Sequence, residues 1–174
     1  MTYLTKNKSR FLVLILISLV IFVLWQYGFQ TIYAKFLTAG ANLYFYIVGS
    51  DTSIAFNIDQ NKPTFWIFLV IDGQQFRFPQ ELGALLQPTV MILAWQLFLF
   101  FVLKPLHAFK LLGINLVIFI AIQFLFIIQL TGYHTSNIQK FIYEFLVGNF
   151  YVIALILIIK DNIFNPVFRL KPKQ

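Results

Sequence analysis

The sequence contains no cysteine among its 174 residues. This absence excludes disulfide bonds, thiolate metal sites and cysteine nucleophiles. Charged residues are also scarce, at 11% of the chain, against about 25% in an ordinary soluble domain. The chain has no HExxH, GxSxG or P-loop motif and no acidic metal cluster. The sequence therefore indicates no complete catalytic or metal-binding site and predicts no cofactor.

Apolar residues, in contrast, make up 60% of the chain, and its mean hydropathy is +0.81. A bilayer core of about 30 Å requires roughly 20 apolar residues in a helix. Four segments meet that requirement, at about 11–29, 82–103, 109–130 and 141–159. The first has no small-x-small cleavage site after it, so we expect a retained signal anchor. The sequence predicts an all-α polytopic membrane protein, one membrane domain over 1–174 with about four spans.

The distribution of charge predicts the orientation. With the N-terminus in the cytoplasm, nine of the thirteen basic residues lie inside, and five of the six acids lie outside or at the outer edge. We therefore expect a bacterial cytoplasmic (inner) membrane protein with both termini cytoplasmic, and no nucleic-acid partner. The tail at 160–174 is basic, and three of its side chains are predicted to contact anionic lipid headgroups; a cytoplasmic docking site is the alternative. These residues are Arg169, Lys171 and Lys173.

An extracytoplasmic insert at 31–80 separates the first two spans. Its first part, Thr31–Val48, predicts an amphipathic helix on the outer leaflet; a fifth span or a re-entrant hairpin is the alternative. The apolar face comprises Ile32, Phe36, Leu43, Tyr44 and Ile47. The polar face comprises Thr31, Lys35, Thr38 and Asn42.

The second part of the insert predicts a small β-hairpin or meander. Ser53–Asp59 alternates apolar and polar residues, and 60–63 supplies a turn. Thr64–Ile71 is too short to cross a membrane as a helix and favours a central strand. Asp72-Gly73 indicates a tight hairpin into a short third strand at 75–78.

Polar residues inside the predicted spans are the next candidates, because such groups are costly in lipid. Asn115, Gln123, Gly148 and Asn149 are predicted to mediate helix packing or partner contacts. Gln87, Gln96 and Gln129 carry the same expectation for their amides. A substrate path lined by these amides is the alternative.

Two titratable residues flank the predicted outer loop between the last two spans. His134 and Glu144 could act together as acid and base. No Ser or Thr stands in a nucleophile motif, so a surface histidine in a polar loop is the competing interpretation. His134 and Glu144 are therefore weak catalytic candidates.

The order of these parts resembles the core of the exosortase and archaeosortase transpeptidases over about residues 50–160. That resemblance implies a Cys near the outer end of the span after the hairpin, an Arg on the returning span and then a His. His134, in Thr131–His134, is a possible match. Around Leu85-Leu86-Gln87 there is no Cys, and 109–130 contains no Arg. The resemblance therefore implies a non-catalytic relative, or a small membrane protein associated with such a system.

Three functions follow as hypotheses. The first is a non-catalytic accessory or scaffold component of an exosortase-type envelope sorting or polysaccharide assembly system. Its partners would be the lipid bilayer and another integral membrane protein. The second is an outer-face membrane enzyme that uses His134 and Glu144. The third is a small transporter subunit.

Overall fold

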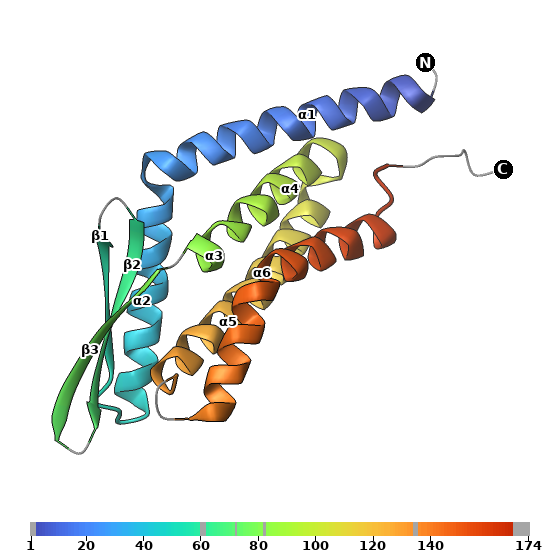
Figure 1. The fold of residues 1–174 in the computed structure, drawn as a ribbon. Coiled ribbons are helices and arrows are strands. Elements are labelled where there is room, and N and C mark those ends of the chain that lie inside the picture. The colour runs from blue at the N-terminus through green and yellow to red at the C-terminus, as the bar shows by residue number, and fades with distance from the viewer. Residues whose placement is uncertain (1–2, 60–61, 72, 82, 134–135, 169–174) are drawn as a thin grey trace.

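The computed structural model describes residues 3–59, 62–71, 73–81, 83–133 and 136–168 (Figure 1). Within them the chain is mostly helical, with one small antiparallel sheet inserted between the second and third α-helices. The helices are α1 (Tyr3–Leu24), a π-helix (Trp25–Phe29), α2 (Gln30–Ile47), α3 (Gly83–Leu86), α4 (Pro88–Val102), α5 (Pro105–Thr131) and α6 (Asn137–Phe164). The strands are β1 (Ser53–Asp59), β2 (Lys62–Ile71) and β3 (Gln74–Glu81).

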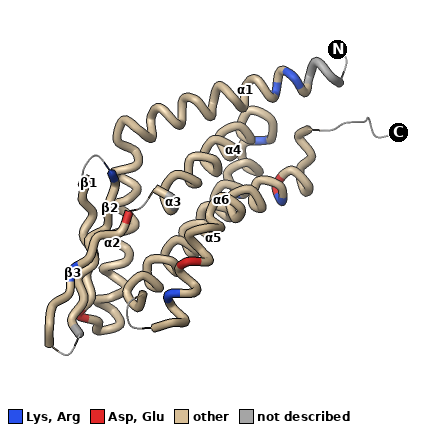
Figure 2. Tube along the Cα trace, viewed as in Figure 1, with Lys and Arg blue, Asp and Glu red and all other residues tan. Residues whose placement is uncertain are grey.

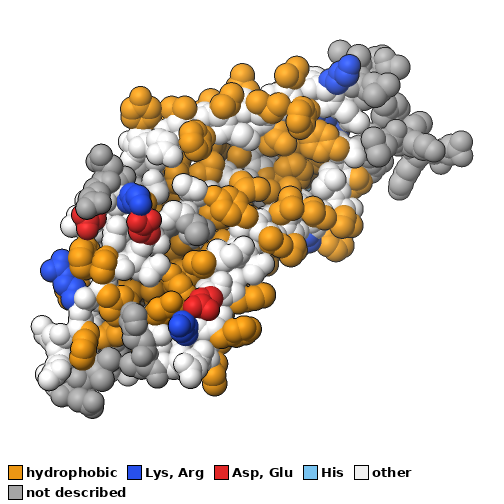
Figure 3. All heavy atoms as spheres, viewed as in Figure 1, with side chains coloured by type: hydrophobic (Ala, Val, Ile, Leu, Met, Phe, Trp, Pro, Cys, Tyr) orange, Lys and Arg blue, Asp and Glu red, His pale blue; other side chains and the backbone are white. Residues whose placement is uncertain are grey.

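Helices α1, α4, α5 and α6 form the helical body of the molecule, with α4 packed against the other three. Three helical segments in the described part of the chain are long and apolar enough to cross a membrane: Asn7–Ile47, Pro105–Thr131 and Asn137–Phe164. The predicted span at 82–103 is divided instead, because Pro88 begins α4 after a turn at Gln87, and α4 has 15 residues. Apolar side chains cover much of the visible helix surface (Figure 3), as expected for helices in contact with lipid.

The two ends of the described chain lie at the same end of the body as the turn between α4 and α5 (Figure 1). The sheet, the C-terminal end of α5 and the N-terminal end of α6 lie at the opposite end. Basic residues mark the first of these ends, and the middle of α1 and of α4 carries no charge (Figure 2). The described arrangement is compatible with a multi-pass membrane protein.

The first helix bends sharply at Gly28, where α1 passes through the π-helix into α2 (Figure 1). Gly28 has φ +131°, a conformation that residues with a Cβ rarely adopt. Below this elbow, α2 buries Ala34, Leu37, Ala41 and Phe45. The face predicted to be apolar is the exposed one, since Ile32 is 67% exposed and Phe36 52%.

The predicted meander is confirmed as a three-stranded antiparallel sheet in the order β1-β2-β3. Ile71 of β2 pairs with Gln74 of β3, and Gly73 directly precedes Gln74. Gly73 has φ +77°, as a tight Asp-Gly turn requires. The third strand is longer than predicted because it continues through Pro79, which an edge strand tolerates.

The sheet packs on α2 through one face, which contributes Ile54, Phe65, Ile67 and Leu69 to the main apolar core. Asn42 of α2 adds two hydrogen bonds to this contact between α2 and the sheet. Its Nδ2 donates to the carbonyl of Ile54 at 2.8 Å, and its Oδ1 accepts from the N–H of Ile54 at 2.8 Å. Two opposed hydrogen bonds from one amide join α2 to β1.

Candidate functional site

A buried carboxylate lies where α4, α5 and α6 meet. Asp161 of α6 is 0% exposed. Its Oδ2 accepts three hydrogen bonds, from Nε1 of Trp95 at 3.1 Å, Nε2 of Gln96 at 2.9 Å and Nδ2 of Asn115 at 2.6 Å. Three N–H donors converging on one oxygen are the environment that an ionised carboxylate prefers. We call Trp95, Gln96, Asn115, Lys160 and Asp161 the carboxylate cluster.

Lys160 completes this cluster. Its Nζ lies 3.4 Å from Oδ1 of Asp161 and donates to Oδ1 of Asn115 at 2.5 Å. The carboxamide of Asn115 therefore bridges the two charges. Oδ1 of Asp161 and Oε1 of Gln96 are buried and have no hydrogen-bond donor among the described residues. The cluster is closely tied, but two of its acceptor atoms lack donors.

The segment after α6 covers the cluster at the end of the body where the two chain ends lie. Phe168 stacks on Phe98 with ring centroids 5.7 Å apart and an interplanar angle of 10°, and it also contacts the ring of Trp95. Val167 is 2% exposed, and its carbonyl accepts from Arg10 of α1. The indole that donates to Asp161 is thereby shielded by the chain itself.

A second buried polar group joins α2, α4 and α5. Nε2 of Gln123 donates to the carbonyl of Leu85 at 2.8 Å and to the hydroxyl of Thr89 at 3.3 Å. Its Oε1 accepts from the hydroxyl of Tyr33. One amide of α5 thus bonds to α2 through Tyr33, to α3 through Leu85 and to the start of α4 through Thr89. We call this the Gln123 junction.

A polar hollow of about 330 Å³ opens beside the Gln123 junction, between the elbow and the base of the sheet. Lys62 and Glu81 form an exposed ion pair at 2.8 Å on its wall. The hydroxyl of Tyr151 donates to Oε1 of Gln87 at 2.7 Å. The residues that line the hollow are Gln26, Gln30, Lys62, Pro63, Glu81, Gly83 and Gln87. The segment Leu85–Gln87, at which the resemblance implies a Cys, therefore contributes amide and backbone groups to helix contacts.

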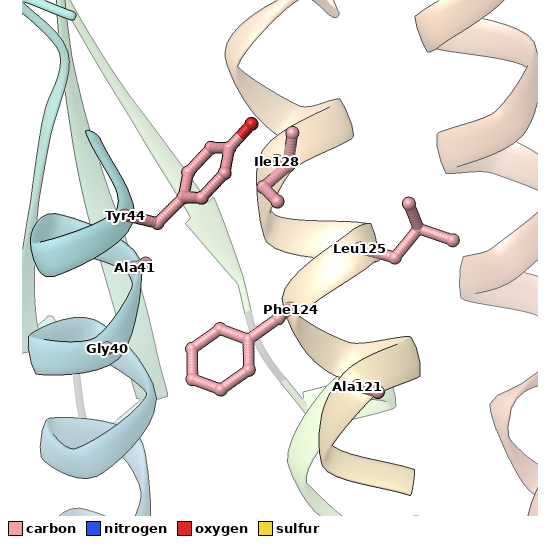
Figure 4. Close-up of a pocket in the computed structure, with 7 residues that line it drawn as sticks. All are labelled: Gly40, Ala41, Tyr44, Ala121, Phe124, Leu125 and Ile128. Carbon is pink, nitrogen blue, oxygen red and sulfur yellow. The ribbon is translucent and has the colours of Figure 1, made fainter. Parts of the chain in front are cut away.

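An apolar groove of about 520 Å³ lies between α2 and α5 (Figure 4). The ring of Phe124 points from α5 toward Gly40 of α2, and Tyr44 reaches from α2 toward Ile128. A Cβ placed on Gly40 would collide with the Phe124 ring, so this glycine allows the close approach of the two helices. The hydroxyl of Tyr44 is the one polar side-chain group in the lining.

The residues predicted to mediate helix packing differ in the contacts that they make. Asn115 and Gln123 each contact other helices, as described above, whereas Asn149 donates to the carbonyl of Phe145 within its own helix. Gly148 is exposed, and a Cβ there would meet nothing within 4 Å, so the close packing predicted at this glycine is absent within the described chain. A contact of Gly148 with another protein stays a prediction.

Other predicted site residues lie outside the described residues. These are His134, Arg169, Lys171 and Lys173. Glu144, the predicted partner of His134, is exposed on α6. No three His, Cys, Asp or Glu side chains group as a metal site within the part of the chain that the structure describes.

Sequence reasoning missed Asp161 because it assigned Lys160-Asp161 to the end of the last span. The helix continues for another turn, to Phe164. A signal was present: the buried residues of α6 follow helical spacing, and Asp161 extends the same stripe. These residues are Tyr143, Leu146, Phe150, Ala154, Leu157 and Asp161.

Comparisons of the chain with protein-family models, with curated proteins and with solved structures found no match.

Proposed function

We propose that the chain is a non-catalytic protein of the bacterial cytoplasmic membrane that spans the bilayer four times, with both ends in the cytoplasm. It presents the sheet, which packs on α2, to another integral membrane protein at the outer face. On the basis of the resemblance, we place it as an accessory or scaffold component of an exosortase-type envelope sorting or polysaccharide assembly system.

The fourth span is supported by the near-continuity of α3 and α4. Gly83 to Val102 is twenty residues, which at 1.5 Å per residue cover about 30 Å. The turn between the two helices keeps its backbone bonded, with Gln87 N donating to Gly83 O at 3.0 Å and Val90 N donating to Gln87 O at 3.0 Å. A bilayer tolerates such a break when its polar groups are paired.

The orientation is tested by reporter fusions. A fusion after Lys110 should report cytoplasm, and a fusion near Gln60 should report the outside, because the basic residues favour the end that carries the α4–α5 turn. A cytoplasmic Gln60 would overturn the proposed orientation.

The observation that carries the scaffold proposal is the free face of the sheet. The guanidinium carbon of Arg77 lies 4.0 Å from the ring centroid of Trp66 and 5.4 Å from that of Phe68. Both rings are half-buried, and they alternate along β2 with residues that pack on α2. Aromatic and arginine side chains are enriched where protein partners bind. This face is the binding surface that we propose, and we call it the outer sheet face.

The charge of Arg77 indicates the chemistry of the partner. In the described part of the chain the ion pairs are Lys62–Glu81 and Lys160–Asp161, so Arg77 pairs with no described carboxylate. We therefore expect an extracytoplasmic segment of the partner to place a carboxylate beside Arg77, with apolar contacts around it.

Co-purification from native membranes at matched expression tests this surface. Arg77→Glu should abolish recovery of the partner that the unaltered chain retains, and a photoreactive side chain at Phe68 should cross-link to the same protein. Lys35→Glu is the matched control, because Lys35 is exposed on α2 and lies outside the outer sheet face. Equal recovery by both charge reversals, or a cross-link to no membrane protein, would refute the proposal.

A further inference from the structure

The polar hollow lies where two neighbouring apolar segments end. The apolar run Phe11–Trp25 is followed directly by Gln26, and α4 begins at Pro88 directly after Gln87. Helices α1 and α4 pack against each other, and each apolar run is about 22 Å long. Tyr27, beside the first glutamine, is 85% exposed, and tyrosine is enriched at membrane–water interfaces. In the proposed membrane embedding the hollow therefore lies at the level of the outer lipid headgroups.

The glutamine amides of the polar hollow provide hydrogen-bonding groups that the described chain leaves free. The carboxamides of Gln26 and Gln30 bond to no described residue, and Gln87 uses its Oε1 to accept from the hydroxyl of Tyr151. The Nε2 of Gln87 therefore keeps both of its hydrogens for a ligand. Together with the ammonium of Lys62, these amides place several N–H donors around a space of about 330 Å³. A phosphate group, whose oxygens accept such hydrogen bonds, is the chemistry that these donors favour.

A second hollow of about 300 Å³ shares Lys62 and Glu81 with the polar hollow, and we call it the Asp59 hollow. It is lined by Asp59, Lys62, Thr64, Pro79 and Glu81. Asp59 forms no ion pair in the described part of the chain, so two carboxylates here face one ammonium. This excess of negative charge favours a cationic group in the Asp59 hollow.

The ion pair that the two hollows share is easily exchanged for contacts with a ligand. The side chains of Lys62 and Glu81 are 61% and 66% exposed, and exposed ion pairs contribute little to stability. A ligand that carries both charges replaces this one contact with two, because its anion binds Lys62 and its cation binds Glu81. A ligand with a single charge leaves one of the two side chains without a partner. The two hollows together therefore favour a zwitterion.

We propose that the two hollows bind the phosphoethanolamine headgroup of a phospholipid. The phosphate lies in the polar hollow, where it accepts from Lys62 and from the glutamine amides. The primary ammonium lies in the Asp59 hollow, where it donates to Glu81 and Asp59; a choline headgroup lacks these N–H donors. This inference rests on the proposed membrane embedding and is independent of the partner proposed for the outer sheet face.

Calorimetric titration of the full-length chain in a neutral detergent tests the headgroup directly. Dihexanoyl phosphatidylethanolamine should bind saturably, and phosphatidylcholine, phosphatidylglycerol and a glucosyl diacylglycerol of the same chain length should bind at least ten-fold more weakly. Glycerophosphoethanolamine has the same two charges without acyl chains and should also bind more weakly than the lipid. No saturable binding, or equal affinity for any of the other lipids, would overturn the inference. Equal affinity for the soluble ester would overturn the assignment to a lipid.

Two pairs of variants locate the binding. Asp59→Asn should lower the affinity for phosphatidylethanolamine at least five-fold, and Asp51→Asn, the same change at an exposed carboxylate outside both hollows, should not alter it. Lys62→Gln should have a similar effect, with Lys35→Gln on α2 as its control. All four side chains are exposed, so each variant should keep the thermal stability of the unaltered protein. Equal affinities in a variant and its control would overturn the inference. Failure of the partner proposal would appear separately, because Arg77→Glu should not alter lipid affinity, and the reporter fusions test the embedding without this titration.

Discussion

Removing the buried carboxylate should destabilise the helical body more than any other single change to a polar side chain. Asp161→Ala leaves three buried donors without their acceptor, on Trp95, Gln96 and Asn115. It also removes the partner of Lys160, which is itself 31% exposed and can reach solvent or headgroups. Each unsatisfied buried donor costs about 1–3 kcal/mol, whereas the loss of the ion pair adds little because Lys160 is partly exposed.

These costs overlap because the same oxygen, Oδ2 of Asp161, accepts all three of these hydrogen bonds. We therefore expect Asp161→Ala to lower the free energy of unfolding by about 3–5 kcal/mol, toward the lower end of the sum for three unsatisfied buried donors. Asp161→Asn retains one acceptor oxygen, loses the charge and replaces the second oxygen with an NH2 donor. It should cost about 1–3 kcal/mol, since hydrogen bonds to a charged group are worth roughly twice those to a neutral one.

Equilibrium unfolding in mixed detergent micelles, followed by tryptophan fluorescence, measures these differences. Glu144→Ala is the control, because it removes an exposed carboxylate from the same helix and should change stability by less than about 0.5 kcal/mol. A double-mutant cycle between Asp161→Ala and Asn115→Ala should give a coupling above about 0.5 kcal/mol, as expected for residues in contact. Equal costs for the two carboxylates, or a coupling of zero, would refute the reasoning.

Two further changes are tested in the same unfolding assay. Gly73→Val should cost roughly 1 kcal/mol or more, because a β-branched residue tolerates φ +77° poorly; unchanged stability would contradict the hairpin turn. Gln123→Leu should cost about 1–3 kcal/mol, because it removes the buried amide that bonds to the Tyr33 hydroxyl and to the Leu85 carbonyl. Asn149→Leu, which affects one bond within α6, is its control, and an equal cost would argue against the Gln123 junction.

The local structure of this protein could be predicted better than its packing. The strand at Ser53–Asp59 was predicted with the bounds that the structure shows, because alternation and turn residues act over a few neighbours. The helix after residue 30 was also predicted, but not the face that it buries. Lipid is as apolar as a protein core, so large apolar residues in such a helix do not mark the packed side. A small residue allows the close approach of two helices at Gly40, but Gly148 is exposed, so small residues do not identify the packed side at every position.

The carboxylate cluster could not be predicted from local signals. Asp161 lies 46 residues from Asn115 and 65 from Gln96, and the sequence alone does not align three helices at that precision. Asp161 also follows Lys160 at the end of an apolar run, a pattern typical of a helix leaving the membrane. Asp161 is recognised as a buried residue only when the helical spacing of the buried residues of α6 is followed one turn beyond Leu157.

The two hydrogen bonds from Asn42 have a mechanical consequence. They hold the backbone of Ile54 in β1 against the side-chain amide of Asn42 in α2, so we expect the sheet and α2 to move together. The chain bends at Gly28, just before α2. Tyr33, five residues beyond Gly28, donates its hydroxyl hydrogen to Gln123 in the Gln123 junction. We therefore expect a displacement of the sheet to act on the Gln123 junction through α2, and on the start of α4 through that junction.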